Sequence, residues 1–115
     1  MLTEIVYIGR SNKIDLVLLA DDSVPSLAGV TRMTLTLNDG TVIDSKVDAG
    51  VFDWTKTITV AEAAKVPGAK AGDSKLVLSL GEVIAASGEY DAELTVYDDE
   101  NTLGITWGRI RLVAQ

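Results

Sequence analysis

SGEYDAELTVYD, at residues 87–98, joins a turn of small residues to a segment with a clear alternation. From Tyr90 onward, apolar side chains occupy every second position, and charged or polar side chains occupy the positions between them. Successive side chains of a strand point to opposite faces, so this pattern predicts a strand with one buried face and one face in water. The buried face is expected to hold Tyr90, Ala92, Leu94 and Val96.

Further segments with strand character lie on both sides of this stretch. Asn38-Asp39-Gly40 is the strongest turn signal, because Asp-Gly accepts the positive φ angles of a tight hairpin. One helical turn is expected at residues 60–65, where Ala, Glu and Lys favour helix. About seven or eight short strands separated by turns predict a single all-β domain over residues 1–115, folded as an antiparallel β-sandwich. The expected strands are 5–8, 14–20, 30–37, 41–47, a less regular one within 51–60, 75–80, the one that starts at Tyr90, and 105–113.

The last expected strand changes phase along its length. Ile105 and Trp107 share one face, whereas Ile110 and Leu112 share the other. Gly108 stands at the point where the phase changes. A β-bulge places one extra residue in a strand and shifts the phase in this way. We therefore predict a bulge at Trp107-Gly108.

The composition excludes several classes of function. The 115 residues include no His and no Cys, which removes His-based catalytic triads, thiol nucleophiles and the usual zinc ligands. Seventeen acidic residues against ten basic ones give a net charge of −7, which disfavours binding to nucleic acid and to anionic membranes. Solubility accounts for this charge, and a docking face for a basic partner is the alternative. The start of the chain does not have the pattern of a signal peptide, and no run reaches the roughly 18 to 20 apolar residues of a membrane helix.

Candidate catalytic groups are few. The acidic pair Asp21-Asp22 has the residue type that glycoside hydrolysis uses, although solvation at the surface explains it more simply. The glycines lack the spacing of a phosphate-binding loop. We therefore expect no enzyme activity, no cofactor and no catalytic residue.

Four features in order along the chain carry a resemblance to a known family. They are the loop at residues 20–31, the hairpin at residues 35–41, the stretch at residues 87–98 and the strand that carries Trp107. On these features the chain resembles the immunoglobulin-like domains of tailed-bacteriophage virion proteins, such as the N-terminal domain of upper baseplate proteins. The resemblance implies an immunoglobulin-like sandwich with a tyrosine corner, in which the ring of Tyr90 packs in the core and its hydroxyl bonds the backbone at the bend.

The same resemblance implies a non-enzymatic structural protein of a virion. Such domains decorate heads, join necks and tails, or hold receptor-binding proteins on a baseplate. The expected partners are other virion structural proteins, with this chain as a homo-oligomer or in symmetric copies, and neither nucleic acid nor membrane. The expected location is the virion, assembled in the host cytoplasm. The alternatives are an adhesive module that binds carbohydrate or a cell-surface ligand and, more weakly, an accessory or regulatory domain of a bacterial host.

One group of carboxylates suggests a metal site. In this topology the loop after the second strand and the last hairpin turn lie at the same end of the sandwich. That places Asp21 and Asp22 near Asp98, Asp99 and Glu100, and Ca²⁺ takes six to eight oxygen ligands. The alternative is a solvated acidic tip without metal.

Three aromatic residues and two strand edges are candidate contact sites. Trp107 is expected in the core, and Trp54 is either packed at an edge or an exposed anchor for a partner. Tyr97 is expected to face outward, where a cross-strand contact or stacking on a sugar would use its ring. The candidate edges for strand addition to a neighbour are residues 1–8 and 105–113.

Overall fold

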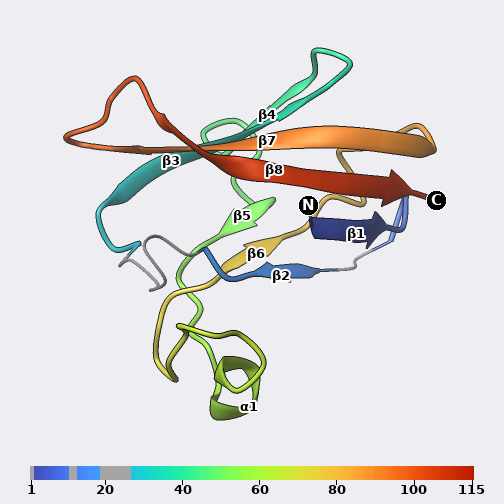
Figure 1. The fold of residues 1–115 in the computed structure, drawn as a ribbon. Helices are drawn as coiled ribbons and strands as arrows, with labels where there is room; N and C mark the ends of the chain where they lie inside the picture. The colour runs from blue at the N-terminus through green and yellow to red at the C-terminus, as the bar shows by residue number, and fades with distance from the viewer. Residues whose placement is uncertain (1, 11–12, 19–26) are drawn as a thin grey trace.

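Two β-sheets packed face to face form the protein (Figure 1). The computed structural model describes residues 2–10, 13–18 and 27–115. One sheet has the order β1-β8-β7-β3-β4, and the other has the order β2-β6-β5. The elements are β1 (Leu2–Val6), β2 (Ile14–Leu16), β3 (Val30–Leu37), β4 (Val42–Asp44), β5 (Phe52–Asp53), α1 (Val60–Ala63), β6 (Leu76–Leu78), β7 (Gly88–Asp98) and β8 (Ile105–Ala114).

The five-stranded sheet is mixed, so the prediction of a purely antiparallel sandwich is wrong at one strand. β1 runs parallel to β8, with the register Leu2↔Ile110 to Val6↔Ala114, and the other pairs are antiparallel. The geometric reason is that β1 and β2 lie in different sheets. β1 therefore pairs with the last strand of the chain and not with its sequence neighbour.

The first strand lies at residues 2–6 and not at residues 5–8. It ends at Val6 because a turn follows, in which the Arg10 N–H donates to the carbonyl of Tyr7 at 3.1 Å. Gly9 takes a φ of +73° in this turn and donates its N–H to the carbonyl of Gly81 at 2.7 Å. Isoleucine and tyrosine side chains favour strands, but here the crossing to the second sheet begins among them.

The core follows the predicted alternation closely. The side chains of Met33, Leu35 and Leu37 are buried, and so is Thr34 on the opposite face of the same central strand. Thr34 is covered because β3 lies between β4 and β7. The other buried residues of the two sheets are Val6, Ile14, Leu16, Ile43, Phe52, Leu76, Val77, Leu78, Ala92, Leu94, Val96, Ile110, Leu112 and Ala114.

The hairpin at Asn38-Asp39-Gly40 is confirmed, and its return strand is shorter than expected. Gly40 has a φ of +92° and the Leu37 N–H donates to the carbonyl of Thr41 at 2.8 Å. β4 then ends at Asp44, not at residue 47. The Asp44 carboxylate accepts the N–H of Lys46 at 3.0 Å, which turns the chain out of the sheet.

The remaining strands match their expected positions, with shorter bounds for β2 and β6 and slightly longer bounds for β7 and β8. β2 and β6 fall within the expected segments at 14–20 and 75–80, and residues 19 and 20 lie outside the described residues. The irregular segment at 51–60 contains β5 and an isolated bridge between Thr57 and Ser74. β7 and β8 form the long hairpin that the alternation predicted.

The helical turn α1 is present, and its N-terminus is a capping box. The side chain of Thr59 accepts the N–H of Glu62 at 3.2 Å, and the Glu62 carboxylate accepts the N–H of Thr59 at 3.1 Å. The Thr-x-x-Glu spacing is visible in the sequence and is the signal of such a start.

The predicted bulge is confirmed. Leu94 pairs with Gly108, while the next residue of β7, Thr95, pairs with Thr106. Trp107 is therefore the extra residue in β8. The phase of β8 changes there, so Ile110 joins the buried face.

Candidate functional site

The bend before β7 is fixed by Tyr90. Its hydroxyl donates a hydrogen bond of 2.8 Å to the carbonyl of Ala86, and its ring packs half-buried against the core. The expected hydrogen bond is confirmed, whereas the ring packs against the core and is only partly buried. Because the bend is tied at its base, β7 leaves the corner in a fixed register with β3 and β8.

The β7–β8 hairpin extends past the rest of the sandwich at one end (Figure 1). The Asp98 carboxylate organises its turn, because Oδ1 accepts the N–H groups of Glu100 at 3.0 Å and Asn101 at 2.7 Å. Leu103 follows in this turn with 95% of its surface exposed, and Ile105 is 44% exposed at the start of β8. The turn therefore presents apolar side chains directly beside carboxylates.

The structure does not test the calcium hypothesis. Asp21 and Asp22 lie outside the described residues, so the structure does not give their distance from Asp98, Asp99 and Glu100. Within residues 2–10, 13–18 and 27–115, no three or more acidic side chains gather closely enough to hold a metal ion.

Tyr97 makes a cross-strand contact on the outer face of the five-stranded sheet. The guanidinium of Arg32, its partner in register, lies 4.7 Å from the centre of the ring. Arg32 also donates from Nε to the Asp44 carboxylate at 3.0 Å, and hydrogen bonding from Arg32 is the main cause that lowers the pKa of Asp44. The contact spans β7, β3 and β4, so the ring of Tyr97 has a structural partner.

The two tryptophans are both half-buried against the core. Trp54 directly follows β5, which supports edge packing over an exposed anchor. Trp107, expected in the core, is the bulged residue of β8 and is buried only in part. Trp54 belongs to the three-stranded side and Tyr97 to the five-stranded sheet, so the structure does not bring them into one aromatic cluster.

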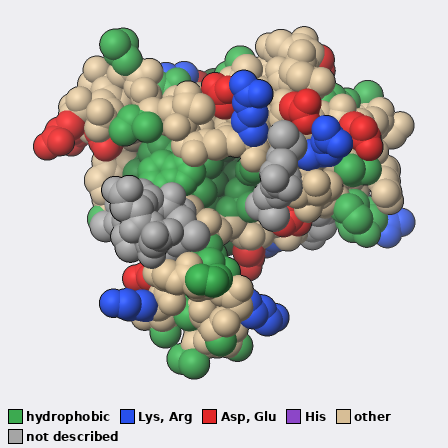
Figure 2. Space-filling view, in the orientation of Figure 1, with side chains coloured by type: hydrophobic (Ala, Val, Ile, Leu, Met, Phe, Trp, Pro, Cys, Tyr) green, Lys and Arg blue, Asp and Glu red, His purple; other side chains and the backbone are tan. Residues whose placement is uncertain are grey.

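An apolar hollow opens between the two sheets beside Trp107. Its volume is about 130 Å³. Figure 2 shows hydrophobic side chains at the floor of a hollow between the sheets. The sequence did not predict this hollow, because the hollow depends on where the strands of the two sheets end relative to one another. The apolar residues of the lining are Leu16, Val17, Leu18, Leu94, Trp107 and Ile110.

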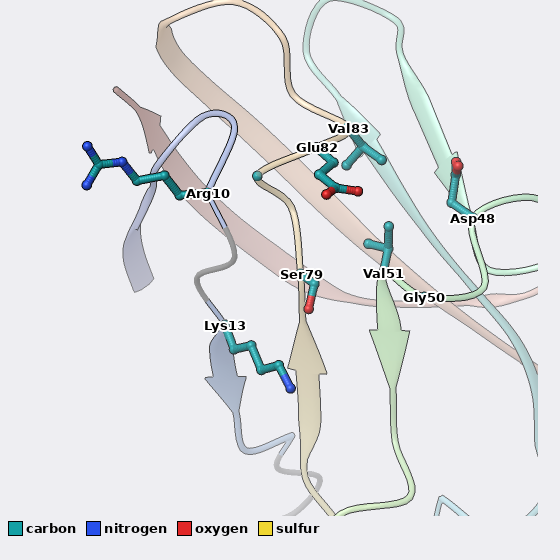
Figure 3. Close-up of a pocket in the computed structure, with 9 residues that line it drawn as sticks. Arg10, Lys13, Asp48, Gly50, Val51, Ser79, Glu82 and Val83 are labelled. Atoms are coloured by element: carbon teal, nitrogen blue, oxygen red, sulfur yellow. The ribbon is translucent and has the colours of Figure 1, made fainter.

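A larger cavity of about 360 Å³, with charged side chains in its lining, lies where the turn after β1, the start of β2 and the end of β6 approach each other. Figure 3 shows Lys13 beside the start of β2 with its side chain extending across toward β6, whereas Arg10 extends away from the cavity. Asp48 and Glu82 stand on the other side. The lining mixes charges of both signs, so the cavity selects no single charged ligand, and its described residues include no nucleophile with an adjacent base.

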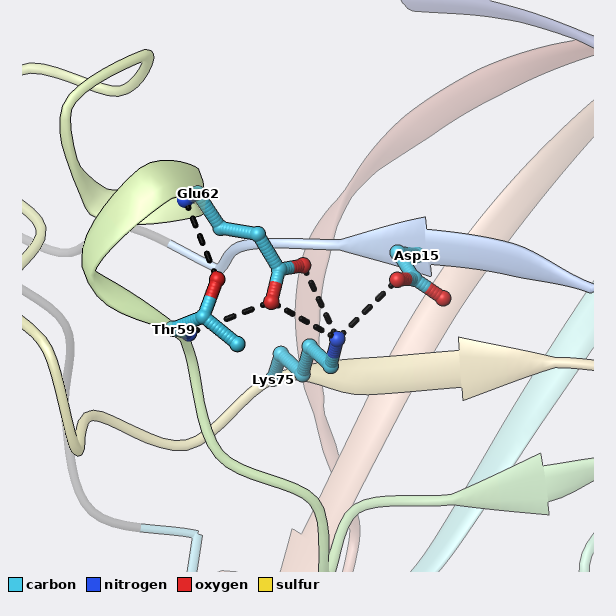
Figure 4. Close-up of polar contacts among 4 residues, drawn as sticks. All are labelled: Asp15, Thr59, Glu62 and Lys75. Atoms are coloured by element: carbon cyan, nitrogen blue, oxygen red, sulfur yellow. Dashed lines mark hydrogen bonds and ion pairs between the residues drawn. The ribbon is translucent and has the colours of Figure 1, made fainter.

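A three-residue ionic network fastens α1 to the sheet (Figure 4). The ammonium of Lys75 donates to Glu62 Oε2 at 2.9 Å and to Asp15 Oδ2 at 3.0 Å. The hydrogen bond from Lys75, together with those from Thr59, lowers the pKa of Glu62 from 4.5 to about 2. This network is structural, because its carboxylates are engaged by Lys75 and by the helix cap. The sequence contained no sign that Asp15, sixty positions away, would meet Lys75.

Comparison with known proteins finds no matching family model, curated protein or solved structure. No helix among the described residues has the length and apolar character needed to cross a membrane.

Proposed function

We propose that this chain is a non-enzymatic structural protein of a tailed-bacteriophage virion, built as an immunoglobulin-like domain. It acts through contacts with other virion proteins, as a head decoration, neck, tail or baseplate component. Its acidic surface suits a protein partner better than nucleic acid or an anionic membrane, because both of those carry negative charge.

The strand order supports the immunoglobulin-like part of the proposal. In such sandwiches the strands B, E and D form one sheet, and G, F, C and C′ form the other. Assigning β2, β6 and β5 to the first set and β8, β7, β3 and β4 to the second reproduces the order of both sheets. The bond from Tyr90 to the carbonyl of Ala86 lies where the tyrosine corner of these folds is found.

The observation that carries the functional part is the projecting β7–β8 hairpin. Leu103 is 95% exposed at its turn, and an apolar side chain of that size in water gains free energy when a partner covers it. The side chains around Leu103 include the carboxylates of Asp99 and Glu100, both exposed. A surface of this kind suits contact with a protein partner.

Electron cryo-microscopy of particles from the source tests this proposal. We expect density for the sandwich in ordered, symmetric copies, and its place separates head decoration from neck or baseplate. Intact particles without the protein would overturn the proposal. Binding on a glycan array would then be measured, because a carbohydrate-binding module is the alternative for a domain of this shape.

A further inference from the structure

The outer edge of β8 is covered over only part of its length. β7 pairs with β8 from Ile105 to Ala114 on one side. β1 pairs on the other side only from Ile110 onward. Among the described residues, no strand lies beside residues 105–109 on that side. Within the part of the chain that the structure describes, backbone groups along this stretch therefore have no ladder partner on that side, as at any sheet edge.

This open edge borders apolar surface. Trp107 and Ile110 belong to β8 and line the hollow of about 130 Å³ whose opposite wall is formed by residues 16–18. Ile105 lies 44% exposed on the same stretch, and Leu103 is almost fully exposed just before it. A strand laid along residues 105–109 would satisfy backbone groups and cover apolar side chains at once.

The charges along the edge favour a second copy of this chain as the source of the strand that pairs with residues 105–109. At the N-terminal end of the stretch, the hairpin turn carries Asp98, Asp99 and Glu100. At the other end stands Arg109, whose side chain is 69% exposed and lies 3.6 Å from Glu93. When two such stretches pair antiparallel, the basic end of each approaches the acidic end of the other. A two-fold axis produces both contacts together, which makes the surface self-complementary.

We propose that residues 105–109 pair antiparallel with the same residues of a second copy, joining two five-stranded sheets into one continuous sheet across a two-fold axis. The contact places Leu103, Ile105 and Trp107 of the two chains around the junction. This pairing deepens the proposed function by naming one partner. Only the biological use of the pairing rests on the proposed function, because the pairing itself is inferred from the free edge.

Sedimentation equilibrium of the purified chain over a range of concentrations tests the pairing. We expect a monomer–dimer equilibrium. Ile105→Lys places a charge on the open edge, and we expect it to weaken dimerisation by about tenfold or more. Val42→Lys is the matched control, because Val42 is 56% exposed on β4 at the opposite edge of the same sheet. It should leave the dimer unchanged.

Three results would overturn the pairing: a monomer at every concentration, a dimer that both substitutions affect alike, or a dimer that only Val42→Lys weakens. Circular dichroism of each variant separates a lost contact from a lost fold, and Thr106→Lys repeats the test at a second exposed position of the edge if Ile105→Lys fails to fold. These measurements use protein free of particles. If no dimer forms, the proposed virion function is still tested by the electron cryo-microscopy of particles. If a dimer forms, that result alone does not establish the virion function.

Discussion

The hydroxyl of Tyr90 and the carbonyl of Ala86, four residues earlier, are joined by a hydrogen bond of 2.8 Å across the bend that leads into β7. The ring lies against the core while the hydroxyl holds the backbone of the corner. β7 is the strand at the centre of the five-stranded sheet, between β8 and β3. A single side chain thus links the core to the point where the central strand begins.

Tyr90→Phe keeps the ring and removes this hydrogen bond. We expect a loss of about 1 kcal/mol in the free energy of unfolding, and a fall in Tm of about 4 °C, because the bond joins a hydroxyl to a neutral carbonyl. Thermal unfolding followed by circular dichroism measures it. Tyr97→Phe is the control, since it removes a hydroxyl from the outer face of the same strand and keeps the ring beside Arg32. Equal losses in both variants would contradict a special role for the corner.

The Lys75 network predicts a specific dependence of stability on pH. The pKa of Glu62 is lowered from 4.5 to about 2 in the folded state. A group with a depressed folded pKa contributes stability that is complete above its unfolded pKa and is lost as the pH falls toward its folded pKa. We therefore expect the Tm to fall between about pH 4.5 and pH 2, and to fall less steeply in Glu62→Gln.

Other carboxylates contribute to the same acid loss, because hydrogen bonds also lower the pKa values of Asp39, Asp44 and Asp53. The slope of the Glu62→Gln variant should therefore be reduced and not abolished. Glu89→Gln, at an exposed position of β7, serves as the matched control and should keep the wild-type slope. A slope that is the same in all three proteins would refute the role of Glu62.

Gly81 is the glycine that the packing requires most. A Cβ at this position would collide with the carbonyl oxygen of Arg10 and lie 2.8 Å from that of Tyr7, and both are backbone atoms that cannot step aside cheaply. We expect Gly81→Ala to cost about 3 kcal/mol of stability. Gly108→Ala should stay within about 0.5 kcal/mol of wild type, because an added methyl group would meet no atom within 4 Å and the φ of Gly108 is not in the left-handed region. Chemical denaturation measures both, and a larger loss in the Gly108 variant would contradict this ranking.

Calcium should leave the Tm unchanged even in large excess over the protein. The Asp98 Oδ1 atom already accepts two backbone N–H groups and the side-chain amide of Asn101, so it holds the hairpin turn without a metal. Asp98→Ala should instead lower stability by about 1 kcal/mol, with or without calcium, because these donors lose their acceptor. A calcium-dependent rise in Tm that disappears in Asp98→Ala would establish the metal site.

Much of the fold could be predicted from the sequence because it depends on local sequence patterns. Alternation predicted β7 with its buried face, Asp39-Gly40 predicted the hairpin, and the phase change predicted the bulge at Trp107. Each of these signals depends on residues that are neighbours in the sequence. The alternation with a period of two and the residue types in the turn indicate these elements without information from the rest of the chain.

The parts that sequence reasoning missed depend on contacts between distant segments. Nothing near Leu2 indicates that β1 would run parallel to β8, at the other end of the chain. The pairing of β1 with only part of β8 was missed for the same reason, because it depends on the register between the two strands. The ion pair of Lys75 with Asp15 joins two segments whose register no local pattern reveals.

The parallel arrangement of β1 and β8 has a mechanical consequence. If a tensile force pulls at Leu2 and at Gln115, the two terminal strands are drawn past each other along their length. The ladder from Leu2↔Ile110 to Val6↔Ala114 is then loaded in shear, and its hydrogen bonds share the load and must break together. An antiparallel terminal pair pulled at one end would instead unzip bond by bond. The domain is therefore expected to resist stretching along the line that joins its ends.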